Sequence, residues 1–436
     1  MRILQITAGA AGMYCGSCLR DNALAAELMR MGHQVTLMPL YTPTLTDEAN
    51  VSQDRVFFGG ISVYLQQHST LFRRLPRFLD RLWDSRWALK AATRGGTATN
   101  PKFLGEMTVS MLRGENGQQR REVEKLVEWL RSEPRPDVAV LPNSMLIGLA
   151  EPLRRELGIP VCCTLQGEDL FLEGLEEPYR STSLRLIRER TAHVDLFLPT
   201  SDYYNDFMSG YLSIPRDKLR TVRLGINLDG YDRVARPADR PFTVGYFARI
   251  APEKGLHVLA EAYRELRKLL PGTPSRLEAA GYMGPENRSY LADIESRLRE
   301  WGLASEFQYH GTLDRAGKIA FLQSLDVLSV PGPYADPKGI FALEAMACGV
   351  PFVQPGHGAF VELEQRTHAG MLTTPADTAS LARSLAQMAS DAELRSRLAD
   401  NAYAGVRRHH AVRNMAESAL EAYSLAATKS NVAVPV

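Results

Sequence analysis

Residues 336–349 read DPKGIFALEAMACG and contain the strongest functional signal in the chain. Two carboxylates, Asp336 and Glu344, are separated by seven residues in this stretch. We expect Asp336 to lie in a loop after the apolar run 327–331, and Glu344 to lie one turn into a helix that begins near Gly339. Such a helix directs its free backbone N–H groups and the positive end of its dipole toward the loop. An anion that also carries hydroxyl groups, such as a sugar diphosphate, suits this arrangement.

A pair of cations precedes this stretch, at the end of another expected strand. Residues 247–255 read FARIAPEKG and supply Arg249 and Lys254. Arginine offers a planar fork that matches phosphate oxygens, and lysine adds a mobile point charge. We expect the two side chains to hold a diphosphate and to stabilise the charge that grows on it as it leaves. The simpler structural alternative is a surface ion pair with Glu253.

The order and spacing of these motifs resemble those of the retaining glycosyltransferase family 4. The second half of that family carries an Arg-x4-Lys pair, matched by Arg249 and Lys254, and a Glu-x7-Glu motif that ends in Glu-Ala-Met-Ala-x-Gly, matched by residues 344–349. The resemblance extends over nearly the whole chain and includes GHQV at 32–35, GINLD at 225–229 and the segment 356–362. It implies an α/β protein of the GT-B fold, in which two Rossmann-like, doubly wound domains face a central cleft.

The resemblance also assigns roles to individual residues. It places Glu344 at the hydroxyl groups of the nucleotide ribose, and Asp336 where the family usually has a glutamate that contacts the transferred sugar. Aspartate is one methylene shorter, and Lys338 stands where an aromatic residue is common, so the identity of the sugar stays open. The implied catalytic residues are Arg249, Lys254 and Asp336. The implied donor-binding residues are these three together with Gly339, Ile340, Glu344 and His310.

The first half offers a glycine-rich loop between its first expected strand and helix. Residues 8–20 read AGAAGMYCGSCLR, and backbone amides near Gly12 and Gly16 could face a phosphate group or an acceptor. The loop is neither a Walker loop nor Gly-x-Gly-x-x-Gly, so a nicotinamide cofactor is not supported. Gln166 stands where many family members have a histidine close to the sugar. We add Gln166 and Asp169 to this acceptor or phosphate site, although Asp169 and Glu168 fit equally well as residues that stabilise their loop.

Bulk properties limit the class of protein. A chain of 436 residues suits two domains, and 51 basic against 50 acidic residues leave a net charge of +1, so no global field attracts nucleic acid. No apolar run reaches the roughly 18–20 residues that a membrane span needs. The start of the chain enters a strand at once, and five cysteines argue for a reducing compartment. We therefore expect a cytoplasmic protein. The sequence lacks Asp-x-Asp, so we expect no metal and no cofactor beyond the nucleotide-sugar substrate.

Short apolar runs alternate with helical patterns, which is typical of parallel α/β layers. We predict strands at 3–8, 35–39, 138–142, 161–165, 196–199 and 219–222 in the first half, and at 243–247, 276–280, 307–310, 327–330, 350–353 and 371–373 in the second. The charged, proline-containing segment 232–241 reads as a linker. The predicted domains are an acceptor-binding domain over 1–231 and a nucleotide-sugar-binding domain over 242–410. The resemblance implies that a helix over 411–427 crosses back to the first domain.

Two segments support more than one interpretation. Residues 71–94 hold seven basic and two acidic residues with apolar residues at helical spacing. They read either as a helix packed on the first sheet or as a weak peripheral contact with a membrane. Cys15 and Cys18 form a Cys-x-x-Cys at a strand-to-helix turn, the setting of a redox pair, yet they also fit as small residues in a tight loop. With Cys162 or Cys163 they could approach a metal, but adjacent strand residues point to opposite faces.

The sequence therefore predicts a metal-independent, retaining glycosyltransferase. It would move a sugar from a nucleotide-diphosphate donor to the hydroxyl group of an acceptor, which is a sugar, a lipid-linked or a small molecule. Phosphorolysis or sugar-nucleotide epimerisation in the same cleft is a rival inside the enzyme class. A catalytically silent nucleotide-sugar-binding module, gated by Cys15 and Cys18, is the alternative from another class.

Overall fold

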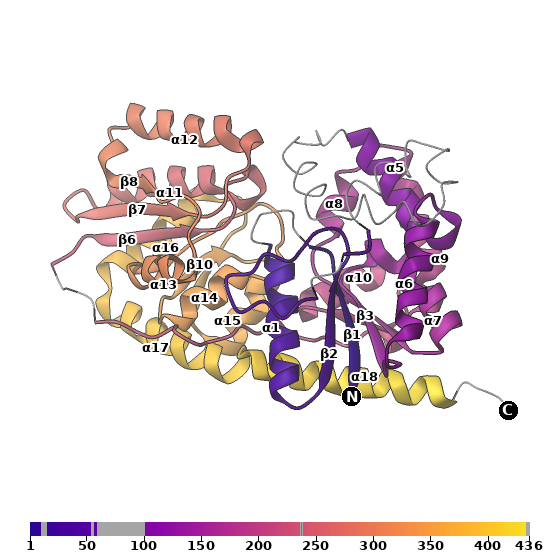
Figure 1. The fold of residues 1–436 in the computed structure, drawn as a ribbon. Helices are drawn as coiled ribbons and strands as arrows, with labels where there is room; N and C mark the ends of the chain where they lie inside the picture. The colour runs from indigo at the N-terminus through magenta and orange to yellow at the C-terminus, as the bar shows by residue number, and fades with distance from the viewer. Residues whose placement is uncertain (10–14, 54–55, 59–100, 236, 238, 433–436) are drawn as a thin grey trace. The chain divides into compact units, whose positions relative to one another are not determined.

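The computed structural model describes residues 1–9, 15–53, 56–58, 101–235, 237 and 239–432 (Figure 1). These residues form two compact units, of which unit 1 comprises residues 1–223 and 415–436 and unit 2 comprises residues 224–414. Each unit is an α/β structure with one parallel sheet. The predicted helix over 71–94 and the predicted site residue Gly12 lie outside the described residues. The predicted domain limits and the linker over 232–241 stay predictions.

Unit 1 is built on a five-stranded parallel sheet with the order β2-β1-β3-β4-β5. Its strands are β1 (Arg2–Thr7), β2 (Gln34–Pro39), β3 (Val138–Leu141), β4 (Val161–Leu165) and β5 (Leu196–Pro199). The chain adds β2 on one side of β1 and then returns to add β3 on the other side. The carboxyl ends of β1 and β3 therefore flank a topological switch point, where open α/β sheets bind their ligands.

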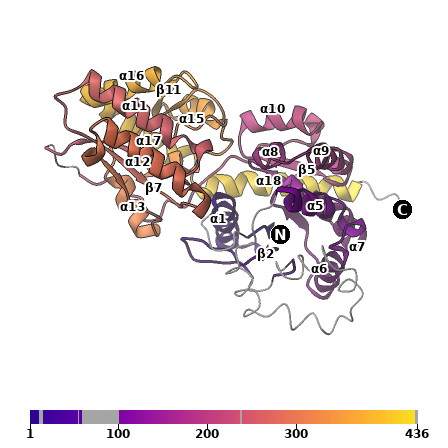
Figure 2. The same cartoon turned by 90° about the horizontal axis from the view of Figure 1, so that it is seen from above.

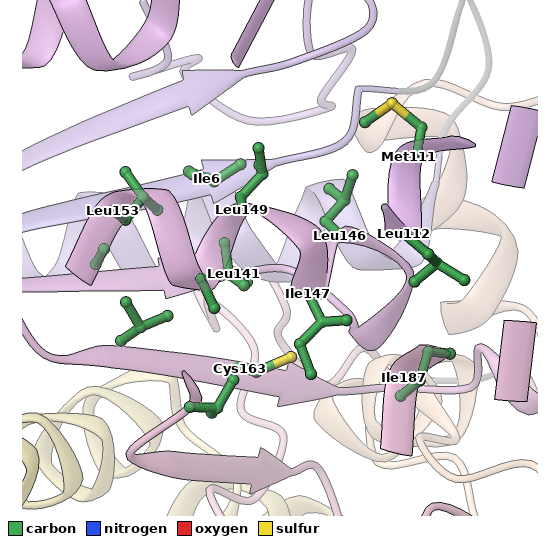
Figure 3. Close-up of a cluster of buried hydrophobic side chains, with 14 of the residues drawn as sticks. Ile6, Met111, Leu112, Leu141, Leu146, Ile147, Leu149, Leu153, Cys163 and Ile187 are labelled. Carbon is green, nitrogen blue, oxygen red and sulfur yellow. The ribbon is translucent and has the colours of Figure 1, made fainter. Parts of the chain in front are cut away.

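One face of this sheet carries the hydrophobic core of unit 1 (Figure 3). Ile6, Leu141 and Cys163 come from three strands, and Leu153 and Ile187 come from helices α7 (Ala150–Leu157) and α9 (Tyr179–Arg190). The remaining helices of the unit are α1 (Gly16–Arg30), α5 (Pro101–Leu112), α6 (Arg120–Ser132), α8 (Asp169–Glu173), α10 (Asp202–Tyr211) and α18 (Val412–Val432).

The other face of the sheet is more polar. Because side chains alternate along a strand, Gln5, Thr7 and Thr164 point away from the core that holds Ile6 and Cys163. All three are nevertheless buried. In α18 the buried residues Met415, Ala416, Ala419, Ala422, Tyr423 and Ala426 recur every three or four positions. This spacing forms one apolar face, as expected for a helix that packs on a domain.

Unit 2 is built on a six-stranded parallel sheet with the order β11-β10-β9-β6-β7-β8. Its strands are β6 (Phe242–Phe247), β7 (Ser275–Ala280), β8 (Phe307–Tyr309), β9 (Val327–Leu328), β10 (Phe352–Pro355) and β11 (Gly370–Thr373). The chain builds β7 and β8 on one side of β6 and then crosses to place β9 on the other side. The switch point of unit 2 is therefore between the carboxyl ends of β6 and β9.

Seven helices of unit 2 cover this sheet among the described residues (Figure 2). They are α11 (Leu256–Leu269), α12 (Arg288–Glu300), α13 (Arg315–Gln323), α14 (Ile340–Ala347), α15 (Ala359–Thr367), α16 (Thr378–Ser390) and α17 (Ala392–His409). Helix α11 contacts α12 and α16, and α17 contacts α14, α15 and α16. No helix of the described chain is both long enough and apolar enough to span a bilayer.

Eleven of the twelve predicted strands occur within two residues of their predicted starts and ends, and the prediction of an α/β fold with two parallel sheets is confirmed. The strand predicted over 219–222 is wrong. Its backbone donates two hydrogen bonds to β5, from Arg220 to Phe197 and from Val222 to Pro199, but only Leu219 forms a bridge. The segment thus extends the sheet edge without forming a sixth strand.

Candidate functional site

The loop after β6 presents the two predicted cations of unit 2. Arg249 is exposed and forms an ion pair with Glu253, which is the structural alternative considered for it. Lys254 points elsewhere, toward the loop that follows β9. Between Lys254 and α11, Gly255 has a φ of +76°, and a Cβ there would lie 2.3 Å from the carbonyl oxygen of Pro331. The loops after β6 and β9 therefore approach each other closely enough to require glycine.

Lys254 and Asp336 meet at the switch point of unit 2. The Nζ atom of Lys254 lies 2.5 Å from Oδ2 of Asp336, and the Asp336 side chain is 11% exposed. The other carboxylate oxygen, Oδ1, accepts hydrogen bonds from the backbone N–H groups of Lys338 at 2.9 Å and Gly339 at 3.1 Å. Burial opposes ionisation, but the Lys254 ammonium and these hydrogen bonds outweigh it and hold the pKa of the Asp336 carboxyl well below its ordinary value.

The loop that carries Asp336 is held by two glycines. Gly339 is the N-cap of α14, which begins where the sequence analysis expected a helix, and has a φ of +60°; Ile340 is the half-buried first residue of that helix. Gly358, after β10, has a φ of +62°, and a Cβ there would lie 2.6 Å from the carbonyl oxygen of Asp336. The N–H of Ala359 donates to the same carbonyl at 2.9 Å. Close backbone packing therefore fixes the position of Asp336.

Glu344 lies in α14, as predicted, and is buried beside a lysine that the sequence analysis did not single out. Lys318 of α13 donates from Nζ to Oε1 of Glu344 at 2.6 Å, and the two side chains are only 6% and 7% exposed. The hydroxyl group of Tyr231 donates to the same oxygen at 3.2 Å. Burial, together with the Glu344 carboxylate, raises the pKa of Tyr231 above its ordinary value, so this tyrosine stays a hydrogen-bond donor. Contact between α13 and α14 brings the lysine to Glu344.

His310 follows β8 and contacts a carboxylate. Its Nε2 lies 2.5 Å from Oε2 of Glu278, and its ring packs edge-on against Phe321 at a centroid distance of 5.4 Å. Glu278 belongs to β7, whose residue Ala279 accepts a hydrogen bond from the N–H of His310. The predicted role of His310 in donor binding stays a prediction.

In unit 1, Glu168 organises the strand ends next to the switch point, those of β3 and β4. This buried carboxylate accepts hydrogen bonds from the N–H and hydroxyl groups of Ser144 at 2.9 and 3.0 Å, and from the N–H of Gln166 at 2.7 Å. Burial raises the pKa of the Glu168 carboxyl, and these hydrogen bonds oppose that shift. The Gln166 amide donates to the carbonyl of Pro142 at 2.7 Å. Glu168 therefore ties the loops after β3 and β4 together.

Asp169 and Gly16, the other predicted site residues of unit 1 that the structure describes, lie in or at the start of helices. Asp169 is buried and accepts a hydrogen bond from the hydroxyl group of Tyr204 at 2.6 Å. Gly16 is the first residue of α1. Among the described residues, the structure groups no three histidines, cysteines or carboxylates at distances suited to a metal ion.

Two family models match the chain, and together they cover both units. The model "Glycosyl transferase 4-like domain" matches residues 21–225, and the model "Glycosyl transferases group 1" matches residues 231–405. The chain belongs to the group 1, family-4-like glycosyl transferases. The ion pairs described above lie within the second match, which includes Arg249, Lys254, Lys318, Asp336 and Glu344.

Comparison with individual proteins gives the same family and fold. The putative colanic acid biosynthesis glycosyltransferase WcaL of Escherichia coli (strain K12) is 28% identical over 248 residues, which cover 55% of this chain and 58% of WcaL. The chain therefore spans less than two thirds of this curated relative. Anabaena Alr3699/HepE, solved with UDP-glucose, has a TM-score of 0.66 at 18% identity and coverage of 98% and 100%. Sucrose-phosphate synthase of Thermosynechococcus elongatus has a TM-score of 0.71 at 18% identity and coverage of 97% and 98%. These neighbours show the GT-B fold.

The structure brings together some of the predicted site residues and separates others. It joins Lys254 to Asp336, whereas Arg249 pairs with Glu253 and Glu344 pairs with Lys318. The sequence analysis did not identify Lys318 or Tyr231 as site residues. In the sequence they are a lysine in an amphipathic helix and a tyrosine just before the predicted linker. Neither feature is unusual enough in a sequence to indicate a role.

Proposed function

We propose that this protein is a retaining glycosyltransferase that moves a sugar from a nucleotide-diphosphate donor to an acceptor hydroxyl group without a divalent metal. The observation that carries the proposal is the contact of Lys254 with Asp336 at the switch point of unit 2, beside the N-terminus of α14. A cation held at this edge of the sheet is positioned for the diphosphate of a donor.

Lys254 can serve Asp336 and a phosphate group at the same time. An ammonium group has three N–H donors, and the Lys254 side chain is 22% exposed, so it can keep the Asp336 contact and still donate to a phosphate oxygen. Arg249 is exposed, and its surface pair with Glu253 is weak enough to exchange for a diphosphate. Both cations would gain most as negative charge develops on the leaving diphosphate.

Asp336 supports this function by positioning Lys254. Both of its oxygens are engaged, one by the ammonium and the other by two backbone N–H groups. This arrangement favours a carboxylate that orients the cation over one that reaches the sugar, and it agrees with the shorter side chain at this position. Retention, with the acceptor attacking the face that the diphosphate leaves, rests on the resemblance to the family.

Ligand-induced thermal stabilisation tests the proposal. Wild-type protein and the Arg249→Ala and Lys254→Ala variants are heated with UDP-, GDP- and ADP-sugars, beginning with UDP-glucose because HepE was solved with it. A donor that binds the native state raises the melting temperature by mass action. We expect one base to raise it in the wild type and to lose most of the effect in both variants.

Two further results separate the candidate functions. Release of the nucleoside diphosphate only when an acceptor is added would support transfer. Tight donor binding without transfer or hydrolysis, across sugar, lipid-linked and small-molecule acceptors, would favour the catalytically silent module. No stabilisation by any donor would contradict the proposal.

A further inference from the structure

Helix α1 begins at a Cys-x-x-Cys sequence whose two sulfur atoms are in contact. Cys15 is the N-cap residue and Cys18 lies in the first turn, so they are neighbours at i and i+3 on one helix face. The thiol groups hydrogen-bond to each other. Cys15 is half-buried, whereas Cys18 is only 1% exposed. A reagent in solution should therefore react with Cys15 more readily than with Cys18.

The local electrostatics give the two thiols different roles. Cys15 is the N-cap residue of a 15-residue helix, so its sulfur lies at the positive end of the helix dipole, where negative charge that develops on it is stabilised. The hydrogen bond with Cys15, and then burial, raise the pKa of the Cys18 thiol. Cys18 thus stays protonated and donates to the sulfur of Cys15. This is the division between an attacking and a resolving cysteine.

The buried carboxylate of Asp21, close to Thr7 and Cys18, is an independent observation that points to chemistry at this site. The hydroxyl group of Thr7 donates to the sulfur of Cys18 at 3.9 Å and is also close enough to Asp21 to lower the pKa of that carboxyl. Asp21 is 1% exposed. Its Oδ1 accepts a hydrogen bond from Arg20 at 2.9 Å, whereas its buried Oδ2 has no hydrogen-bond partner among the described residues. A buried polar atom without a partner is costly and calls for an explanation.

We propose that Cys15 and Cys18 are a redox-active dithiol that exchanges with a disulfide of the glutathione type, and that Thr7 and Asp21 take up the proton of Cys18. Both cysteines belong to unit 1 and precede residue 21, where the family match begins. A structural role as small residues in a tight turn would explain Cys15 and Cys18, but it would not explain the unpartnered oxygen of Asp21.

The exchange has two steps. The Cys15 thiolate attacks one sulfur of the external disulfide, the S–S bond breaks, and one thiolate leaves, which gives a mixed disulfide on Cys15. The sulfur of Cys18 then attacks the sulfur of Cys15 and expels the second external thiolate. In this step the Thr7 hydroxyl group, which donates to Cys18 in the reduced protein, turns to donate to Asp21; it then accepts the Cys18 proton and gives its own proton to the Asp21 carboxylate. Two protein thiols are oxidised and one external disulfide is reduced.

Titration against glutathione tests the proposal on the full chain. The protein is equilibrated at graded ratios of glutathione to glutathione disulfide, quenched with acid and alkylated, and its thiols are mapped by peptide mass. We expect the free thiols of Cys15 and Cys18 to disappear together, because they form an intramolecular disulfide, and we expect no glutathione to remain bound. Full alkylation of both at every ratio, or glutathione that persists on Cys15 of the wild type, would overturn the proposal.

Single variants separate the two roles. Cys18→Ser should trap glutathione on Cys15, and Cys15→Ser should leave Cys18 reduced. Cys348 is also buried but belongs to unit 2, so Cys348→Ser is a matched control that should leave the titration unchanged. If Cys18 of the Cys15→Ser variant reacts as fast as Cys15 of the wild type, the assignment of the attacking thiol is wrong.

The proton path has a test of its own. Thr7→Val removes the hydroxyl group with little change in shape, and we expect it to slow closure of the mixed disulfide about tenfold or more. The ratio of glutathione to glutathione disulfide at half-oxidation should hardly change, because a proton path affects the rate and not the equilibrium. A structural disturbance would shift this ratio. Thr164→Val is the matched control on the same sheet face, since Thr164 contacts Arg20 at 3.5 Å. Equal closure rates for Thr7→Val and wild type would overturn the path. Sugar transfer enters none of these measurements, so their outcome is independent of the proposed function.

Discussion

The two units place their switch points in the same way but equip them differently. In each sheet the chain first adds strands on one side of its first strand, β1 in unit 1 and β6 in unit 2, and then crosses to add strands on the other side. In unit 2 a half-buried lysine meets an aspartate there. In unit 1 the carboxylate of Glu168 lies beside the switch point, where it accepts hydrogen bonds from the N–H groups of Ser144 and Gln166 and joins the ends of β3 and β4. The topology supplies an edge for a ligand, and the loop side chains decide its charge.

The largest effect should come from removing the cation that distinguishes unit 2. Lys254→Ala should abolish donor-induced stabilisation and lower kcat/KM by about 10²–10³-fold, because the leaving diphosphate loses its cation. Thermal shift and transfer kinetics with the donor identified in the panel are the measurements.

A matched ion pair in unit 1 controls for the loss of stability alone. Lys125 contacts the buried carboxylate of Glu122 at 3.1 Å and has a side-chain exposure of 20%, against 22% for Lys254. Lys125→Ala should leave donor binding intact. Equal loss of donor binding in both variants would mean that the difference between the units is not one of function.

The second effect concerns the buried ion pair of Lys318 and Glu344. Lys318→Met leaves the Glu344 carboxylate buried without its cation and should lower the free energy of unfolding by about 3 kcal/mol. Urea unfolding, followed by a probe in unit 2, measures the change. Lys318→Met combined with Glu344→Leu should recover much of it.

A surface pair provides the reference for that measurement. Arg185 and Glu189 are 59% and 51% exposed, so Arg185→Ala should change the free energy of unfolding by less than about 1 kcal/mol. A similarly small effect of Lys318→Met would show that the contact with Glu344 is loose in solution.

The third effect is a pH dependence in unit 1. Burial raises the pKa of the Asp21 carboxyl from 3.8 to about 6, against the opposing effect of Arg20. Because the folded-state pKa is the higher one, this contribution to stability is fully present below pH 3.8 and is lost as the pH rises through about 6. The groups that face Asp21 or its neighbours are Arg20, Cys15 and Cys18 of α1 and Tyr423 of α18.

Asp21→Asn isolates this titration because asparagine does not ionise. Between pH 4 and 7, the free energy of unfolding of the wild type should fall by about 1–2 kcal/mol relative to that of the variant. Parallel pH profiles for the two proteins would place the carboxylate in a better-solvated position than the structure shows.

The smallest effect should be at Gln166. Its amide donates to Pro142 within unit 1, so Gln166→Ala should cost about 1 kcal/mol of stability and leave donor affinity nearly unchanged. Isothermal titration with the donor measures the affinity. A tenfold loss of donor affinity would show that the strand ends of unit 1 also bind the donor, and it would weaken the comparison between the two units.

Sequence reasoning predicted the elements better than the contacts. Eleven strands and the start of α14 near Gly339 followed from local patterns, because apolar runs and glycine turns depend on near neighbours in the chain. The contact of Lys254 with Asp336 joins residues 82 positions apart, and that of Lys318 with Glu344 joins residues 26 positions apart. Such pairs depend on which loops and helices become neighbours. The strand predicted over 219–222 failed because its pairing with β5 ended after one bridge.

The sequence by itself determined the two α/β units, the helix that begins after Gly339 and the family motifs at 249–254 and 336–349. Periodicity and glycine placement are local properties, so they can be recognised without knowledge of the fold. Only the tertiary structure decided that Lys254 holds Asp336, that Lys318 neutralises Glu344, and that Thr7 and Asp21 lie behind Cys18. The energy of a charged or polar group depends on its burial and its partners, and packing alone sets both.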